Sequence, residues 1–333
     1  MLIYLIAFSA VFVLGFLLMP QIAKIAERLD FTDKPTERKK HKHPIPLSGG
    51  VAMFLAFAVG FVVFVLVLGG EPDLPATPAM PEFLSLPAVL LGAAMILGIG
   101  LVDDFSKTKG KEFPIWPRLL VHFGAASLAF AAGVRFTGFH NPFTDQYQYL
   151  HLWLQYTLTV LWFVGLITAF NFMDGLDGLS GLLALVSGCT FFVVAIHMQQ
   201  PQSAFLAAIF VGAVAGFLRF NLPPAKIYMG DSGAYLLGFL LAAISLQGAF
   251  KQATVISLAI PMLAMGVPIF DGMLVVVRRL IARKPAHVAD STHITHIHFR
   301  LLKDGMKPSH AVMLIFLLSA CLNLVSIIMM LVF

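Results

Sequence analysis

Carboxylate side chains stand in three short polar stretches of a chain that is otherwise strongly apolar. An adjacent pair, Asp103 and Asp104, occurs in GLVDDFSKTKGK, and Asp174 and Asp177 stand three residues apart in NFMDGLDGLSG. A fifth carboxylate, Asp231, follows a glycine in KIYMGDSGAYLLG. Charged groups at a membrane boundary are costly, so either water covers these acids or they take part in chemistry.

Each stretch has a chemical interpretation and a structural one. Asp103 and Asp104 end an apolar run, where a helix C-terminus disfavours anions; a divalent cation or a basic group would relieve that cost, and nearby lysines are the plain alternative. Asp174 and Asp177 would share one face if their segment were helical, or they cap the next helix. Near Asp231, backbone N–H groups could bind an anion, or the carboxylate could hold Mg²⁺ together with substrate phosphates. The structural alternative is that Asp231 caps the helix that follows.

A fourth polar stretch, THITHIHFR, supplies imidazole rings and a guanidinium group. The spacing of His296 and His298 suits an extended loop, and Arg300 follows them. Zinc binding is one alternative, although no cysteine is near; contact with a phosphate and a passive loop are the others. His293 belongs to the same stretch, whereas His122 lies inside an apolar run and is interpreted as a packing histidine.

Composition indicates what kind of protein positions these groups. Of the 333 residues, 59% are hydrophobic and 12% are charged, against about 25% charged in a typical soluble domain. The apolar residues form runs of about 18 or more, long enough for a helix to cross a ~30 Å hydrocarbon core. We therefore predict an all-α polytopic membrane protein with a single domain over residues 1–333, whose first run is a retained helix and not a signal peptide.

Ten membrane spans are predicted from these runs. The ninth contains Pro261 and Pro268, so it should be bent or broken. Cys189 and Cys321 lie inside apolar runs and are interpreted as buried small hydrophobes, not as metal ligands or a disulfide. The expected spans are 1–20, 47–69, 86–102, 117–135, 152–170, 179–197, 203–220, 233–248, 253–277 and 309–333.

Basic residues are distributed unevenly between the two sides of this topology. Every lysine and arginine except Arg135 and Lys251 falls on the side that contains the segments following spans 1, 3, 5, 7 and 9. The positive-inside rule makes that side cytoplasmic, with both termini outside. All four polar stretches reach this face, which predicts an aqueous site at the inner surface of the cell membrane. The basic stretch 33–50 suits anionic lipid headgroups or a phosphorylated lipid, and the net charge of +5 requires no nucleic acid.

Acids that could hold Mg²⁺, together with basic residues on the same face, favour phosphoryl transfer, which depends on positioning and charge neutralisation. The sequence has no Walker Gly-x-x-x-x-Gly-Lys pattern. Acids at mid-bilayer, expected of an ion-coupled transporter, are missing with the exception of Asp271. Lys111 and Arg118 follow the aspartate pair. They either steer anionic substrates or only reflect the excess of basic residues on the cytoplasmic side.

Taken in order, the polar stretches resemble the polyprenyl-phosphate N-acetylhexosamine-1-phosphate transferase family, from residue 33 to about 305. The form PLSGG is similar to the branch that transfers GlcNAc-1-phosphate from UDP-GlcNAc to undecaprenyl phosphate, whereas the phospho-MurNAc-pentapeptide branch usually differs there. Phe299 stands where many GlcNAc-type relatives have histidine. The matching stretches are DKPTERKKHKHPIPLSGG, LVDDF, AFNFMDGLDGLSG, NLPPAKIYMGDSGAYLLGF, PIFDG and HIHFR.

The resemblance implies a transferase at the cytoplasmic face of the cell membrane. It would move N-acetylhexosamine-1-phosphate, GlcNAc-1-phosphate in the first instance, from a UDP-sugar to a polyprenyl phosphate and release UMP. Such a reaction begins cell-envelope glycan synthesis, as for cell wall, lipopolysaccharide or teichoic acid. The resemblance also implies Mg²⁺, with Mn²⁺ as the alternative ion, and contact with membrane lipids; a homodimer stays open.

By motif, the resemblance places Asp103, Asp104 and Asp231 in the catalytic set, with Asp231 and Asp103 as metal ligands. A phospho-MurNAc-pentapeptide transferase, a transporter or flippase for a lipid-linked sugar, and a non-catalytic scaffold are the alternatives. The residues implied in substrate binding are Asn171, Asp174, Asp177, Asn221, His296, His298, Arg300, Lys111 and Arg118.

Overall fold

The computed structural model describes residues 1–35, 43–68, 81–141, 146–247, 255–281 and 296–332. Helices dominate, and two small antiparallel sheets pair β1 (Thr32–Asp33) with β2 (Ile45–Pro46) and β3 (Gly138–Asn141) with β4 (Gln146–Tyr149). The helices are α1 (Leu2–Arg28), α2 (Gly49–Leu68), α3 (Pro81–Thr108), α4 (Ile115–Ala131), α5 (Leu152–Met173), α6 (Leu179–His197), α7 (Pro201–Asn221), α8 (Gly230–Gln247), α9 (Val255–Ala264), α10 (Gly266–Ile281), α11 (Ile297–Lys303) and α12 (Pro308–Val332).

The all-α membrane class is confirmed. Six helices of the described part are long and apolar enough to cross a membrane: α1, the segment Pro87–Thr108 of α3, α5, α6, α7 and α12. The full set of ten spans stays a prediction. Several helices extend past their expected ends, because polar residues such as Asp103 and Asp104 continue α3 where the apolar run stops.

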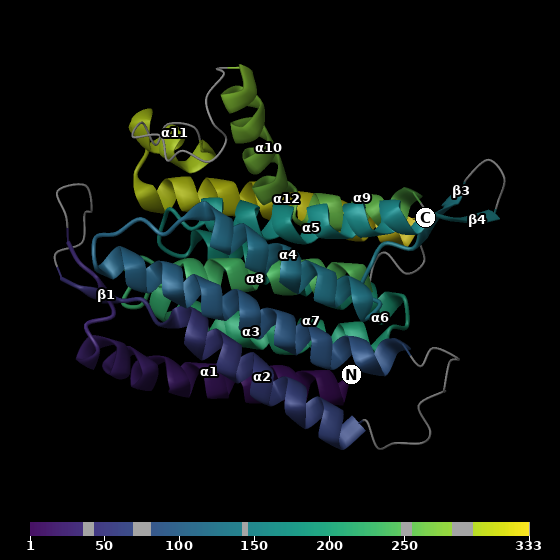
Figure 1. Ribbon diagram of the computed structural model, residues 1–333, viewed down its shortest axis with the longest axis horizontal. Coiled ribbons are helices and arrows are strands. Elements are labelled where there is room, and N and C mark those ends of the chain that lie inside the picture. The colour runs from purple at the N-terminus through teal and green to yellow at the C-terminus, as the bar shows by residue number, and fades with distance from the viewer. Residues whose placement is uncertain (36–42, 69–80, 142–145, 248–254, 282–295, 333) are drawn as a thin grey trace.

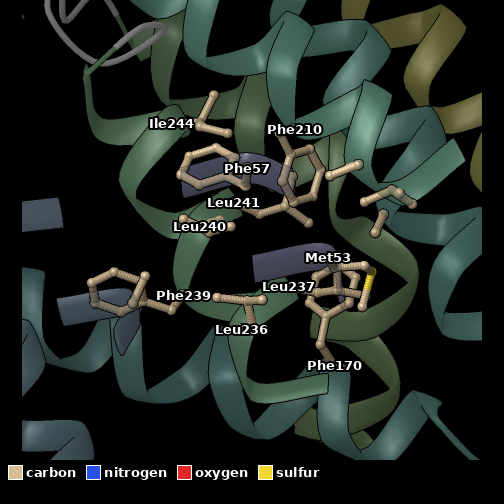
Figure 2. Close-up of a cluster of buried hydrophobic side chains, with 14 of the residues drawn as sticks. Met53, Phe57, Phe170, Phe210, Leu236, Leu237, Phe239, Leu240, Leu241 and Ile244 are labelled. Carbon is tan, nitrogen blue, oxygen red and sulfur yellow. The ribbon is translucent and has the colours of Figure 1, made fainter. Parts of the chain in front are cut away.

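Helix α8 lies at the centre of a bundle of long helices that run along the longest axis of the molecule (Figure 1). Almost every residue of α8 is buried, because α3 and α5 pack along it and α2 covers a further side. Figure 2 shows its apolar side chains, such as Leu237 and Leu241, among Met53 and Phe57 of α2, Phe170 of α5 and further buried residues. The N-terminus of α8 is therefore held by several neighbours at once.

Glycines let α8 approach its neighbours at backbone distance. A Cβ atom at Gly238 would lie 2.6 Å from the Cα of Ile167 in α5, and one at Gly100 of α3 would overlap the Cα of Ser232 in α8. Small residues commonly allow such close contacts between membrane helices. The second contact lies one turn from Asp103 and Asp104, so it sets the distance between these acids and the start of α8.

The region expected as the ninth span forms two helices. α9 ends at Ala264 and α10 begins at Gly266, and α10 stands steeply away from the axis of the bundle (Figure 1). Pro268 lies in the first turn of α10, where backbone N–H groups have no partner within the helix. The N–H that proline lacks therefore costs no helical hydrogen bond there. That α9 and α10 together form one bent span stays a prediction.

The two cysteines are exposed and free, so the prediction that they are buried was wrong. Cys189 lies on α6 and Cys321 on α12. In a membrane protein the outward face of a helix is as apolar as its inward face, since lipid surrounds it. An apolar run therefore does not show which of its residues are buried.

Replacing Gly100 by alanine should lower the apparent unfolding temperature in detergent, because the added methyl group forces α3 away from α8. Overpacking of this kind costs about 1–3 kcal/mol. Gly98→Ala is the matched control on the same helix, where an added Cβ meets nothing within 4 Å and no loss is expected. Equal losses in the two variants would contradict the close contact of α3 with α8.

Candidate active site

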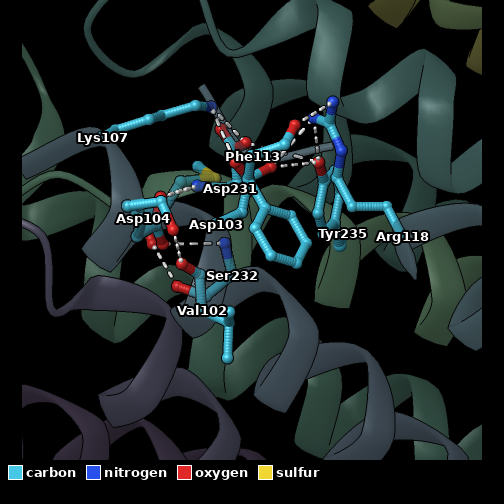
Figure 3. A network of polar contacts seen from close by, with 11 residues as sticks. Val102, Asp103, Asp104, Lys107, Phe113, Arg118, Asp231, Ser232 and Tyr235 are labelled. Carbon is cyan, nitrogen blue, oxygen red and sulfur yellow. Dashed lines mark hydrogen bonds and ion pairs between the residues drawn. The ribbon is translucent and has the colours of Figure 1, made fainter. Parts of the chain in front are cut away.

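Asp104 ties α3 to the first turn of α8. Its Oδ1 accepts a hydrogen bond from the backbone N–H of Asp231 at 2.7 Å, and its Oδ2 accepts one from the N–H of Ser232 at 3.0 Å (Figure 3). The first N–H groups of a helix have no partner within it, and negative charge is favoured there. α8 therefore compensates a carboxylate that would be unfavourable at the end of α3. The N-terminus of α8, which the sequence analysis considered as a possible anion site, thus already binds the carboxylate of Asp104.

Glycine is needed where this tether forms. Gly230 has a φ of 69°, a left-handed conformation that glycine adopts without steric cost. A Cβ atom at this position would overlap the carboxylate of Asp104. The close approach of α3 therefore explains why a glycine precedes Asp231.

Asp103 is fully buried and is bound through only one of its oxygens. Its Oδ2 accepts hydrogen bonds from Nη1 of Arg118 at 3.0 Å and from the hydroxyl of Tyr235 at 3.0 Å. Nη2 of Arg118 donates to the carbonyl of Phe113 at 3.2 Å, which fixes the guanidinium group. Oδ1 of Asp103 has no hydrogen-bond donor, and the ammonium group of Lys107 lies 3.9 Å away.

Lys107 forms an ion pair with Oδ2 of Asp231 and lies close to Asp103 as well (Figure 3). The hydroxyl of Tyr235 is 3.3 Å from the same oxygen of Asp231. One ammonium group thus lies within 4 Å of both carboxylates, beside the guanidinium of Arg118. This arrangement brings acids from α3 and α8 together with two cations at a single junction.

Asp174 belongs electrostatically to this cluster. It lies in the turn after α5, and its pKa is raised well above the usual range by burial and by the negative charges of Asp231 and Asp104. Asp177 serves a different contact, because its Oδ2 accepts a hydrogen bond from the N–H of Ala225 at 3.0 Å. Since residues 174–178 form turns and not a helix, the two acids do not share a helical face.

Asn221 joins the same turn to the loop that leads to α8. Its Oδ1 accepts a hydrogen bond from the N–H of Gly178 at 3.0 Å, and its Nδ2 donates to the carbonyl of Ile227 at 2.9 Å. These bonds and that of Asp177 hold two loops side by side. Asn171 lies in the last turn of α5, just before Asp174. Nucleotide binding by these residues stays a prediction.

Within the described part of the histidine stretch, α11 begins at Ile297, and His296 before it keeps an extended backbone. The expectation of an extended loop was therefore wrong for His298 and Arg300, which lie in the helix. Asp271 of α10 explains the difference: its Oδ1 accepts a hydrogen bond from the N–H of Ile297 and its Oδ2 contacts Nδ1 of His296, both at 2.7 Å. A carboxylate thereby supports the first turn of the helix. The ring of His298 packs against Gly175, where a Cβ would overlap it.

The remaining predicted residues differ in how closely they join the site. Arg118 is part of the cluster, whereas Arg300 of α11 and Lys111 beyond α3 are exposed. His293 lies outside the described residues. His122 is buried, with its ring edge-on to Tyr235 at 4.9 Å, which confirms a packing role; neither ring nitrogen has a hydrogen-bond partner.

Three residues of the network escaped the sequence analysis as site residues: Lys107, Tyr235 and Asp271. Lys107 was counted toward the topology and as one of the lysines that could balance the aspartate pair, but not as a site residue. Tyr235 stands four residues after Asp231, so helical spacing places both on one face, and this signal was available. Asp271 was noticed as an isolated acid in an apolar span, but its partners lie some 25 residues further along the chain.

Among the residues that the structure describes, no three His, Cys, Asp or Glu side chains are grouped to hold a metal ion by themselves. Mg²⁺, however, usually takes only one or two carboxylates, with substrate phosphates and water completing its shell. The unpartnered Oδ1 of Asp103 and the nearby carboxylate of Asp231 fit that demand. The donor set therefore suits an ion that arrives with a phosphorylated substrate.

Comparison with known proteins shows that this chain is similar to transferases. Residues 86–249 match the model of glycosyl transferase family 4. The chain is 31% identical to the probable undecaprenyl-phosphate N-acetylglucosaminyl 1-phosphate transferase of Bacillus subtilis, over 97% of this chain and 84% of that protein. It is 32% identical to the decaprenyl-phosphate N-acetylglucosaminephosphotransferase of Mycobacterium tuberculosis, over 89% and 75%. It is 30% identical to the phospho-N-acetylmuramoyl-pentapeptide-transferase of Listeria welshimeri, over 69% of each.

In buffer without divalent ions, Asp174→Asn should raise the apparent unfolding temperature at pH 7 and flatten its dependence on pH. Because the pKa of Asp174 is raised in the folded protein, the folded state binds a proton that the unfolded chain releases near pH 4. Stability is then lost as pH rises from about 4 toward the folded pKa. Thermal unfolding across this range in detergent measures the effect.

Asp177→Asn is the control, since this acid lies in the same turn but accepts the N–H of Ala225. That variant should not be stabilised. A pH profile of Asp174→Asn that coincides with the unmodified protein would contradict the placement of Asp174 among the other acids.

Proposed function

The chain belongs to glycosyl transferase family 4, and from this we propose that it transfers GlcNAc-1-phosphate from UDP-GlcNAc to undecaprenyl phosphate and releases UMP. The observation that supports this most is the junction of α3 and α8. There the carboxylates of Asp103 and Asp231 meet the cations Lys107 and Arg118, beside the turn that carries Asp174. A diphosphate needs such positive charge, and a divalent ion needs such oxygens.

Asp231 and Asp103 would hold Mg²⁺, because Asp231 lies at the edge of the cluster and Asp103 has an oxygen available. When bound, this ion would neutralise the diphosphate and the departing UMP. Lys107 and Arg118 add positive charge for the phosphates from the side of α3 and α4. Asp104 holds both of its oxygens on α8, so its role is to position Asp231.

In the reaction, an oxygen of the acceptor phosphate attacks the β-phosphorus of the donor. The new P–O bond forms as the bond between the β-phosphorus and the oxygen bridging to UMP breaks. The second pKa of a phosphate monoester is near 6, so at pH 7 little base assistance is needed. Oδ1 of Asp103, which has no hydrogen-bond donor, is therefore left for the ion and is not needed as a base.

The site faces the cytoplasm in this proposal. Both chain termini lie toward the end of the bundle opposite to β1 (Figure 1). β2, the partner of β1, leads into Leu47, which pairs with Tyr228 just before the start of α8. The positive-inside rule places the basic end in the cytoplasm, so both termini are outside. This agrees with the ten expected spans, because an even number of spans puts the two termini on the same side. The acceptor's apolar chain would follow α10, where Phe270, Met273 and Leu280 are exposed beside Asp271 and His296.

Purified protein with Mg²⁺, undecaprenyl phosphate and UDP-GlcNAc should release UMP, and omission of the acceptor or addition of a chelator should stop release. UDP-MurNAc-pentapeptide should be a poor donor. Asp231→Asn should lower the rate by about 100-fold or more, as for removal of a key electrostatic group. UMP is measured by chromatography.

The control for charge is Asp30→Asn, which removes an exposed carboxylate paired with Lys34 and should leave the rate unchanged. A preference for UDP-MurNAc-pentapeptide would assign the other branch of the family. Absence of UMP with every donor would favour a transporter and contradict the proposal.

A further inference from the structure

The hydroxyl of Tyr235 lies among three charged groups from three helices. It is 3.0 Å from Oδ2 of Asp103 on α3, 3.3 Å from Oδ2 of Asp231 on its own helix α8, and 3.4 Å from Nη1 of Arg118 on α4 (Figure 3). The side chain is buried.

A phenolic hydroxyl has one proton to donate. It can therefore serve Asp103 or Asp231 at a given moment, but not both, while its lone pairs accept from Arg118. Lys107 already pairs with Asp231, and the distance from the hydroxyl to Asp103 is the shorter of the two. The proton of Tyr235 accordingly belongs to Asp103.

Two donors then converge on one oxygen of Asp103. Arg118 and Tyr235 both bind Oδ2, so rotation of the carboxylate would break two hydrogen bonds at once. Oδ1 is left without a donor and faces the side of Lys107. The clamp on Oδ2 thus decides which oxygen of Asp103 is available to a ligand.

The ring of Tyr235 cannot easily leave this position. The imidazole of His122 packs edge-on against it, with ring centroids 4.9 Å apart and planes at 76°. His122 and Arg118 stand one turn apart on α4, so a single helix supports both the ring of Tyr235 and its charged partner. The hydroxyl is therefore placed by packing as well as by hydrogen bonds.

We propose that Tyr235 is a positioning residue that, together with Arg118, clamps Oδ2 of Asp103 and presents Oδ1 to a divalent ion bound with the nucleotide diphosphate. This inference rests on the proposed function for its ligand. It assigns Tyr235 no contact with the reacting atoms. Its removal should loosen ion binding and slow the chemical step while leaving recognition of the donor intact.

The test uses Tyr235→Phe in the full-length protein. Phenylalanine keeps the ring that packs against His122, so the variant should fold. Binding of Mn²⁺ in the presence of UDP, read from the electron paramagnetic resonance of free Mn²⁺, should weaken about tenfold, since a hydrogen bond to a charged group is lost. In turnover, kcat should fall about tenfold, and KM for UDP-GlcNAc should stay unchanged.

Tyr156→Phe is the matched control. It removes a hydroxyl that contacts Ser127 at 2.9 Å on the outer side of α4 and α5, and it should bind Mn²⁺ and turn over like the unmodified protein. A Tyr235→Phe variant that only unfolds at lower temperature, with Mn²⁺ affinity and kcat unchanged per folded protein, would overturn the proposal.

The measurement of Mn²⁺ binding does not depend on turnover, so it can be interpreted even if the protein shows no activity. If the unmodified protein releases no UMP but Tyr235→Phe still weakens Mn²⁺ binding, the proposed function fails and the clamp holds. If the unmodified protein binds no Mn²⁺ even with UDP, the clamp has no ligand and the inference is overturned.

Discussion

The contact between the carboxylate of Asp104 and the first N–H groups of α8 is the constraint on which the site depends. It joins an acid at the end of one helix to the start of another, so two unfavourable ends compensate each other. The backbone approach at Gly100 and the left-handed Gly230 allow this contact. Once it forms, Asp231 stands beside Asp103, and the positions of Lys107, Arg118 and Tyr235 follow from the helices that carry them.

The neighbouring aspartates of one motif therefore have different tasks. Asp104 uses both oxygens within the fold, whereas Asp103 keeps one oxygen available. Adjacent residues on a helix point about 100° apart, so one can face a neighbouring helix end while the other faces the cluster. A similar division holds in the turn after α5, where Asp177 binds a loop and Asp174 joins the acids.

Much of the architecture could be predicted from the sequence, because long apolar runs identify helices and their polar ends identify one face. The ends of those runs also led to the expectation of one site that gathers Asp104, Asp174 and Asp231, and the charges of Asp104 and Asp231 do act on Asp174. The contacts that give each residue its task could not be predicted, since they join residues far apart in the chain: Asp104 with Ser232, and Asp271 with Ile297. The prediction that the cysteines are buried failed for a related reason, because hydropathy cannot separate the lipid-facing side of a helix from its packed side.

Lys107 gives the acids a resident counter-charge. Buried carboxylates without compensation are strongly destabilising, and a protein that relied on an external ion for this would assemble only where that ion was bound. Here an ammonium group of the chain itself pairs with Asp231 and lies 3.9 Å from Asp103. The newly inserted polypeptide can thus complete its bundle in the bilayer without an external cation. If the proposed Mg²⁺ binds at this junction, it would then affect turnover and not the amount of folded protein.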